Sequence, residues 1–142
     1  MNKKDVQGIV GIIKNNNAII KIYKAKHNVR IVRVNFEEGD DLVVTGCTLK
    51  HALQKTSKIL QGEKCKEICV QGIPSADSLL DAVLDNGFVI LSKSTHDSKL
   101  ANLSLFNNNK ELVFVATAPA ERSVLGLFEK AEEYLTNNTI EM

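Results

Sequence analysis

The sequence contains no tryptophan, five phenylalanines, two tyrosines, two prolines and three cysteines in 142 residues. With so few aromatic residues, the core must be built from Ile, Val and Leu. Three cysteines without a regular framework exclude a small disulfide-stapled scaffold and indicate free thiols in a reducing compartment. Runs of 18 or so apolar residues are also missing, which excludes a membrane-spanning segment. We therefore expect a protein of the cytoplasm. No histidine pair has metal-ligand spacing, so no metal is expected.

What remains is an ordinary globular composition with an uneven distribution of charge. Hydrophobic residues make up 44% and charged residues 25% of the chain, and the formal net charge is +1. This size and composition favour a single domain over residues 1–142. Residues 1–35 hold eight Lys and Arg against one acidic residue, whereas residues 36–142 hold ten against sixteen. Such a division indicates either an anion-binding surface or two oppositely charged faces that attract each other, within or between subunits.

Hydrophobic periodicity predicts an α+β fold whose two parts differ. Residues 1–41 form a basic β-rich segment, and residues 42–142 form a segment of strands and helices. The three strands predicted in the first segment, with a hairpin at Asn15-Asn16-Asn17, are 6–14, 18–26 and 29–36. A β-α-β-α-β series, a hairpin and a C-terminal helix follow, over 42–45, 48–60, 66–71, 75–85, 88–91, 100–106, 111–117 and 121–135. Pro119 suits the first position of the last helix. The expected sheet is mixed, with antiparallel strands at its N-terminal side.

The order βαβαββ over residues 42–117 resembles the arrangement in Alba-type nucleic-acid-binding domains. The resemblance is one of element order, and it implies a nucleic-acid-binding function as one alternative. The side chains expected to be buried together are Val43, Leu53, Ile68, Val70, Leu79, Val83, Ile90, Val113, Val115, Leu127 and Phe128.

Three segments share one pattern: an apolar run, a turn of small residues and then a helix start, at 42–48, 68–75 and 112–119. A strand that enters a helix through a tight turn directs unpaired backbone N–H groups toward one place, where anions bind. Glu121 places a carboxylate near the third start, so the first two are preferred. The predicted ligand-binding residues are Thr45, Gly46, Thr48, Gly72 and Ser75, with Lys24 or Arg30 closing over the ligand. Ordinary helix capping explains the same residues.

Two groups of residues are candidates for catalysis. Cys47 lies at a helix start, which lowers a thiol pKa, and His51 is four residues further along the same helical face. His96 stands beside Asp97 in a polar loop, where it could act as a general base. A capped helix with a small buried thiol, and a solvated loop, are the structural interpretations of the same residues. No nucleotide-binding fingerprint is present, so the sequence leaves open whether the protein is an enzyme.

We expect a small, non-enzymatic, cytoplasmic binding module for an anionic ligand, such as a nucleotide or another phosphate-bearing molecule, or for a protein partner. A homo-oligomer is expected, formed through the N-terminal strands or helix 121–135, because the β-rich start offers exposed edges. The alternatives are a small enzyme dependent on the cysteine or on the His-Asp pair, and an Alba-like nucleic-acid-binding protein. The small net charge counts against tight non-specific DNA binding. No cofactor is identified by the sequence.

Overall fold

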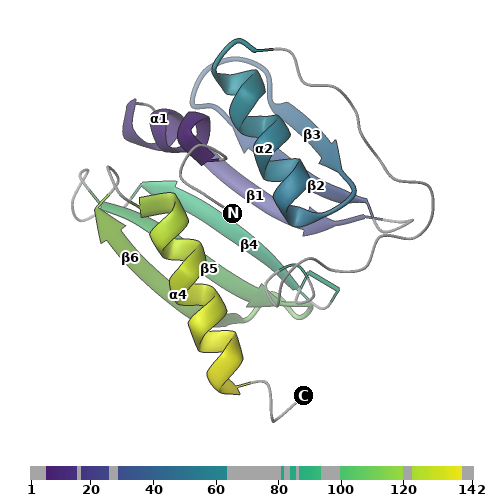
Figure 1. The fold of residues 1–142 in the computed structure, drawn as a ribbon, viewed down its shortest axis with the longest axis vertical. Coiled ribbons are helices and arrows are strands. Elements are labelled where there is room, and N and C mark those ends of the chain that lie inside the picture. Colours follow the sequence, from purple (N-terminus) through teal and green to yellow (C-terminus); the bar gives the residue numbers. More distant parts are fainter. Residues whose placement is uncertain are drawn as a thin grey trace.

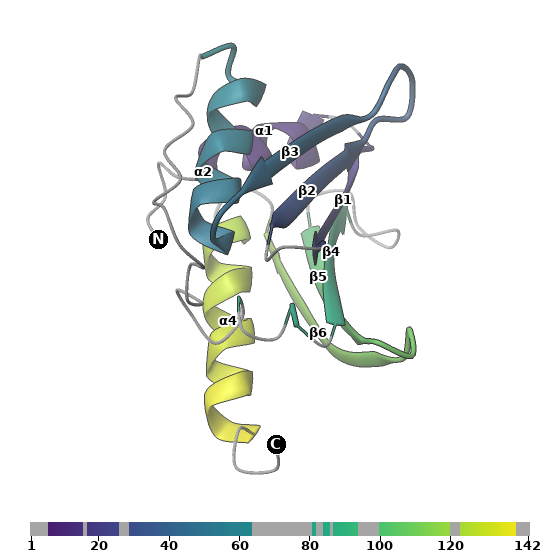
Figure 2. The same ribbon diagram turned by 90° about the vertical axis from the view of Figure 1, so that its right-hand side faces the viewer.

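The fold is a six-stranded antiparallel sheet whose described helices all lie on one face (Figures 1 and 2). The computed structural model describes residues 6–15, 17–25, 29–63, 81, 84–85, 87–93, 100–119 and 123–138. The elements in chain order are α1 (Gln7–Asn15), β1 (Ile19–Lys24), β2 (Arg30–Asn35), β3 (Leu42–Gly46), α2 (Leu49–Leu60), β4 (Gly87–Lys93), β5 (Leu100–Asn107), β6 (Leu112–Pro119) and α4 (Ser123–Asn138). The strand order is β3-β2-β1-β4-β5-β6.

Two similar halves meet at the centre of the sheet. Strands β1, β2 and β3 are followed by α2, and β4, β5 and β6 are followed by α4. The halves join through the antiparallel pair of β1 and β4, in which Lys21 lies opposite Ile90. An antiparallel pair has local two-fold symmetry perpendicular to the sheet, so it places both helices on the same face. The α+β class is confirmed, but the described strands pair only antiparallel and do not form the expected mixed sheet.

The core lies between the helices and the covered face of the sheet. Alternate strand residues point to this face, and those that are fully buried include Ile20, Ile22, Val32, Val34, Leu91 and Leu103. Leu53, Leu127 and Phe128 are buried as predicted. The prediction was wrong for Val43, Val113 and Val115, which are exposed on the other side of edge strands. In a continuous run of apolar residues, hydrophobicity alone does not show which alternate residues face the helices. Ile68, Val70, Leu79 and Val83 lie outside the described residues.

Helix α1 replaces the strand predicted over residues 6–14, and the hairpin predicted at Asn15-Asn16-Asn17 is wrong with it. Val6, Ile9 and Ile13 are buried at the three- and four-residue spacing of a helix face. The two helices α1 and α2 come close at Gly8, where the backbone N–H donates to Ser57 Oγ at 2.7 Å. A Cβ on Gly8 would lie 2.2 Å from the Ser57 carbonyl oxygen. A glycine that weakens a helix in isolation is therefore required here by packing.

The other described elements lie close to their predicted positions, with differences near β6. The hairpin between β5 and β6 is confirmed: Asn107 Oδ1 accepts from the N–H groups of Asn109 and Glu111 at 2.9 and 3.0 Å. Pro119, predicted to begin a helix, is the last residue of β6, and α4 begins at Ser123. Most of the elements predicted at 66–71 and 75–85 lies outside the described residues, although Asp81 is helical. No described helix is long and apolar enough to cross a membrane.

The strand order also differs from the one expected if residues 42–117 formed a single βαβαββ unit, as in the Alba-type arrangement. Strand β3 is separated from β4 by β2 and β1, so the strands of residues 42–117 are not contiguous in the sheet. The ends of β3 and β6 lie at opposite edges of the sheet and point in opposite directions, because five antiparallel pairings separate them. The first and third predicted helix starts therefore cannot share a ligand.

Two substitutions test which side chains belong to the core between α2 and the sheet. Leu53→Ala should lower the free energy of unfolding by about 2–5 kcal/mol, because it leaves a cavity in a fully buried site. Val43→Ala should change it by less than about 0.5 kcal/mol, because this side chain is exposed. Urea unfolding followed by circular dichroism measures both. Equal losses for the two variants would contradict the assignment of the covered face.

Candidate functional site

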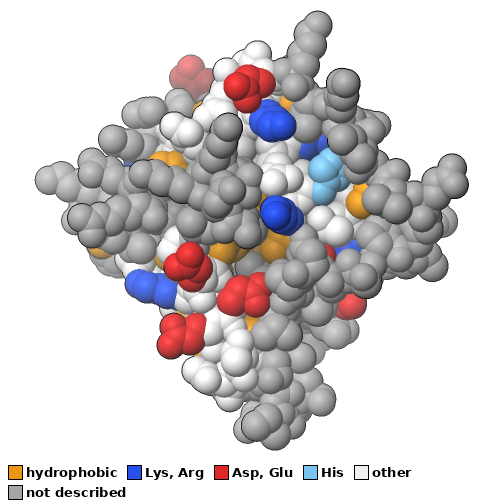
Figure 3. Space-filling model, viewed as in Figure 1, with side chains coloured by type: hydrophobic (Ala, Val, Ile, Leu, Met, Phe, Trp, Pro, Cys, Tyr) orange, Lys and Arg blue, Asp and Glu red, His pale blue; other side chains and the backbone are white. Residues whose placement is uncertain are grey.

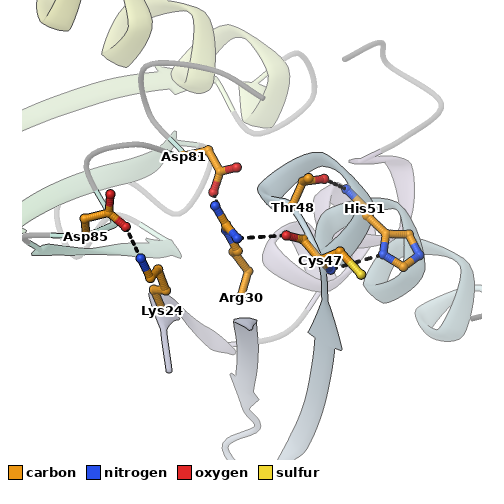
Figure 4. A network of polar contacts seen from close by, with 7 residues as sticks. All are labelled: Lys24, Arg30, Cys47, Thr48, His51, Asp81 and Asp85. Atoms are coloured by element: carbon orange, nitrogen blue, oxygen red, sulfur yellow. Dashed lines mark hydrogen bonds and ion pairs between the residues drawn. The ribbon is translucent and has the colours of Figure 1, made fainter. Parts of the chain in front are cut away.

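The start of α2 is the first predicted site, and its polar groups bond to one another (Figure 4). Thr48 is the N-cap, and its Oγ1 accepts from the His51 N–H at 3.1 Å. The ring Nδ1 of His51 accepts in turn from the Cys47 N–H at 3.3 Å. The predicted cap is therefore confirmed. Two of the donors that an anion would use are already paired within the helix start.

Gly46 serves packing between β3 and α2. A Cβ on this residue would lie 2.6 Å from the Ala52 backbone nitrogen and 2.8 Å from the Ala52 Cβ. Thr45, its neighbour in β3, is exposed on the opposite face of the sheet. The first predicted cradle is therefore divided between the two faces. Gly72 and Ser75, which were predicted to complete it, lie outside the described residues.

The catalytic candidates do not form a catalytic pair in the described part of the chain. Cys47 is disulfide-bonded, so the expectation of a free thiol is wrong for this residue. The cysteine argument for a reducing compartment no longer holds, since disulfides persist in oxidising environments. His51 contacts the Cys47 backbone and cannot activate a thiolate there. His96 and Asp97 lie outside the described residues.

Both predicted ligand-closing cations form ion pairs with acidic residues that precede β4. Arg30 Nε donates to Asp81 Oδ1 at 2.8 Å, and Arg30 Nη1 donates to the Cys47 carbonyl oxygen at 2.8 Å. This pair is buried, with 3% and 0% of the two side chains exposed. Lys24 pairs with Asp85 closer to the surface. Part of the charge division in the sequence is therefore an attraction within one chain, an interpretation left open above.

The second candidate is the face of the sheet opposite the described helices, which is called the uncovered face below. The sequence analysis did not identify this surface as a whole. Tyr23, Phe88 and Phe106 point to this face from three neighbouring strands. The rings of Phe88 and Phe106 stack with centroids 4.9 Å apart and planes 10° from parallel. Lys21 Nζ lies 4.6 Å from the Phe88 centroid and 5.3 Å from the Tyr23 centroid. The face therefore carries a row of aromatic rings with a cation over it.

In the described strands, the charged side chains on the uncovered face are all cations. Lys21 pairs across the strands with Arg33, so the two lie on the same face. Arg33 Nη1 is 3.9 Å from Asp41, which precedes β3, and both side chains are well exposed. Among the described residues, Lys21 pairs with no carboxylate. The helix-bearing face differs, because acidic and basic side chains lie interspersed on it (Figure 3).

The remaining positions on the uncovered face are apolar or neutral and polar. They are Ile19, Ile31, Asn35, Val43, Thr45, Ile90, Ser92, Leu100, Asn102, Ser104, Leu112, Val113, Val115 and Thr117. Lys21 and Tyr23 lie two residues apart in the strand predicted over 18–26, but nothing local in the sequence connects them with Phe88 and Phe106. Those residues join the row only through the pairing of β1 with β4, which spans about half of the chain.

Comparison with known proteins found no matching family model, no matching curated protein and no matching solved structure. Among the described residues, no group of three His, Cys, Asp or Glu side chains is placed to hold a metal ion. The function is therefore inferred from the geometry of the start of α2 and of the uncovered face.

The buried ion pair gives a test of what holds the start of α2 to the rest of the chain. Arg30→Met should lower the free energy of unfolding by about 3–5 kcal/mol, because it removes the positive charge that faces the buried Asp81 carboxylate. Lys24→Met is the matched control, and it should cost no more than about 1 kcal/mol because its pair is closer to solvent. Urea unfolding at neutral pH measures both variants. A loss for Arg30→Met no larger than the control would contradict a structural role for this pair.

Proposed function

We propose that this protein is a non-enzymatic binding module that holds a nucleotide-bearing anion, such as a short single-stranded nucleic acid, on its uncovered sheet face. The observation that carries the proposal is the row of Tyr23, Phe88 and Phe106 beneath Lys21. Aromatic side chains on a sheet stack with unpaired bases, and nearby cations attract the phosphates.

The charges on this face support an anion as the ligand. Lys21 and Arg33 lie side by side, and no strand places an acidic side chain on the same face. The start of α2 is the weaker candidate, because its cations are paired with Asp81 and Asp85 and its backbone donors are partly occupied. The uncovered face has both components that such a ligand requires, stacking surface and positive charge.

The same observations limit the strength and type of binding. The described strands place two cations on the face, Lys21 and Arg33, and the net charge of the chain is +1. Binding should therefore depend modestly on salt, with a slope of log K against log salt near about −1.4 for two phosphate contacts to a single strand. Double-stranded DNA should bind less well, because its bases are paired and cannot stack on protein rings.

Fluorescence anisotropy with a labelled oligothymidine strand of about 12 nucleotides tests the proposal. Tyr23→Leu and Phe106→Leu should each weaken binding by about 1–3 kcal/mol, because leucine fills the space without a flat ring. Lys21→Ala should also weaken binding and make the salt slope shallower by about 0.7. The matched control is Lys58→Ala, which removes the same charge from an exposed position of α2.

The control variant should bind as the unchanged protein does. Absence of binding by the unchanged protein at low salt would contradict the proposal. Equal losses for Lys21→Ala and Lys58→Ala would also contradict it, since they would indicate an attraction to net charge and not to this face.

A further inference from the structure

The outer edge of β6 is the most apolar exposed part of the described chain. Three of the six exposed large hydrophobic side chains lie on this strand: Leu112, Val113 and Val115, with exposed fractions of 56%, 45% and 46%. Strand β6 is the last in the sheet order, so its outer backbone groups meet no described strand. An edge of this kind presents unpaired N–H and C=O groups to any strand that approaches.

The two edges of the sheet differ in the features that prevent association. Strand β3, at the opposite edge, is five residues long and follows the acidic loop 37–41. Strand β6 is eight residues long and contains no charged residue. Charges and short length are the common means by which natural edge strands avoid pairing. Strand β6 lacks both, and Pro119 at its end limits the length available for pairing.

A groove runs between this edge and helix α4. It has a volume of about 430 Å³ and is lined by Phe114, Val115 and Ala116 of the strand and by side chains of α4. The rings of Phe114 and Tyr134 stack in it with centroids 4.5 Å apart. Lys130 and Glu133 lie at the α4 side of the same groove. The groove therefore has an apolar floor and a rim that carries one charge of each sign.

We propose that the occupant of this edge is a second copy of the chain, with the two β6 strands antiparallel about a two-fold axis near Val115. The axis pairs Val115 with Val115 of the second copy, and Val113 with Thr117 of the second copy. A closed two-fold contact requires a surface that is complementary to itself. Unpaired backbone groups and exposed valines on one strand meet that requirement.

The rim of the groove supports the same symmetry. A two-fold axis that relates two antiparallel α4 helices about residues 131–132 brings Lys130 of one copy toward Glu133 of the other. The groove contains both Val115 and these two residues, so one axis serves strand and helix together. Lys130 Nζ donates to the Thr117 carbonyl oxygen at 3.1 Å, which holds this cation beside the edge of β6.

This assembly goes beyond the proposed ligand site and does not depend on it. The two sheets would join into one of twelve strands, with all described helices on one side. An extended peptide from another protein could pair with the same edge, but nothing on the groove rim favours a peptide of one charge. The self-complementary rim favours the second copy.

Sedimentation velocity of the full chain over a range of concentrations tests the proposal. The unchanged protein should be a dimer at tens of micromolar. Val115→Lys should weaken the dimer by roughly tenfold or more, because it places two like charges opposite each other at the axis. Val43→Lys is the matched control, since Val43 is an equally exposed valine on the other edge strand. It should leave the dimer intact.

A charge exchange provides a second readout that does not alter the strand. Lys130→Glu and Glu133→Lys should each weaken the dimer, and the double variant should restore it, because the pair across the axis is then re-formed with its signs exchanged. Circular dichroism confirms that each variant is folded. A monomeric unchanged protein would overturn the proposal, as would a dimer that Val43→Lys dissociates and Val115→Lys does not.

Discussion

Among the described residues, helices cover only one face of the sheet, and this one-sided coverage determines the environment of every strand side chain. Side chains alternate across a strand, so each strand gives half of its residues to the core and half to the uncovered side. Ile20 and Ile22 are buried under the helices, while Lys21 and Tyr23 between and beside them are not. The same alternation collects the aromatic row and the two cations on a single surface. A second layer of helices on that side would have required apolar residues there instead.

The buried pair of Arg30 and Asp81 connects the two halves of the chain on the covered side. An arginine and an aspartate in the interior are costly to desolvate, and the Cys47 carbonyl oxygen takes a further guanidinium N–H. These contacts hold Arg30, the first residue of β2, against both the start of α2 and the segment before β4. Lys24 and Arg30, which the sequence offers as ligand contacts, therefore form ion pairs within the chain. Lys21 and Arg33 are the cations that the described strands place on the uncovered face.

The sequence predicted the local elements well and their assembly poorly, for physical reasons. Strands β1, β2 and β3 and helix α2 follow from apolar periodicity and from the Thr48 cap, which are local signals. Helix α1 was missed because two glycines and several β-branched residues weaken helix propensity, and its helical state depends on packing of Gly8 against Ser57.

The candidate surface needed information that no local pattern contains. The partners of Lys24 and Arg30 are about 50 to 60 residues away in the chain, as their ion pairs show. The aromatic row depends on the pairing of β1 with β4, and a one-residue change in the register of either strand would disperse it. The disulfide at Cys47 likewise could not be inferred from cysteine spacing.

The most direct test of the central claim is a map of the ligand contact by nuclear magnetic resonance. The uniformly ¹⁵N-labelled protein is titrated with unlabelled oligothymidine, and the amide shifts are followed residue by residue. We expect the largest changes in amide chemical shift on the central strands around Lys21, Tyr23, Phe88 and Phe106, with little change along α2 and α4. Changes concentrated at the start of α2 or along the helices, or no changes at all, would contradict it.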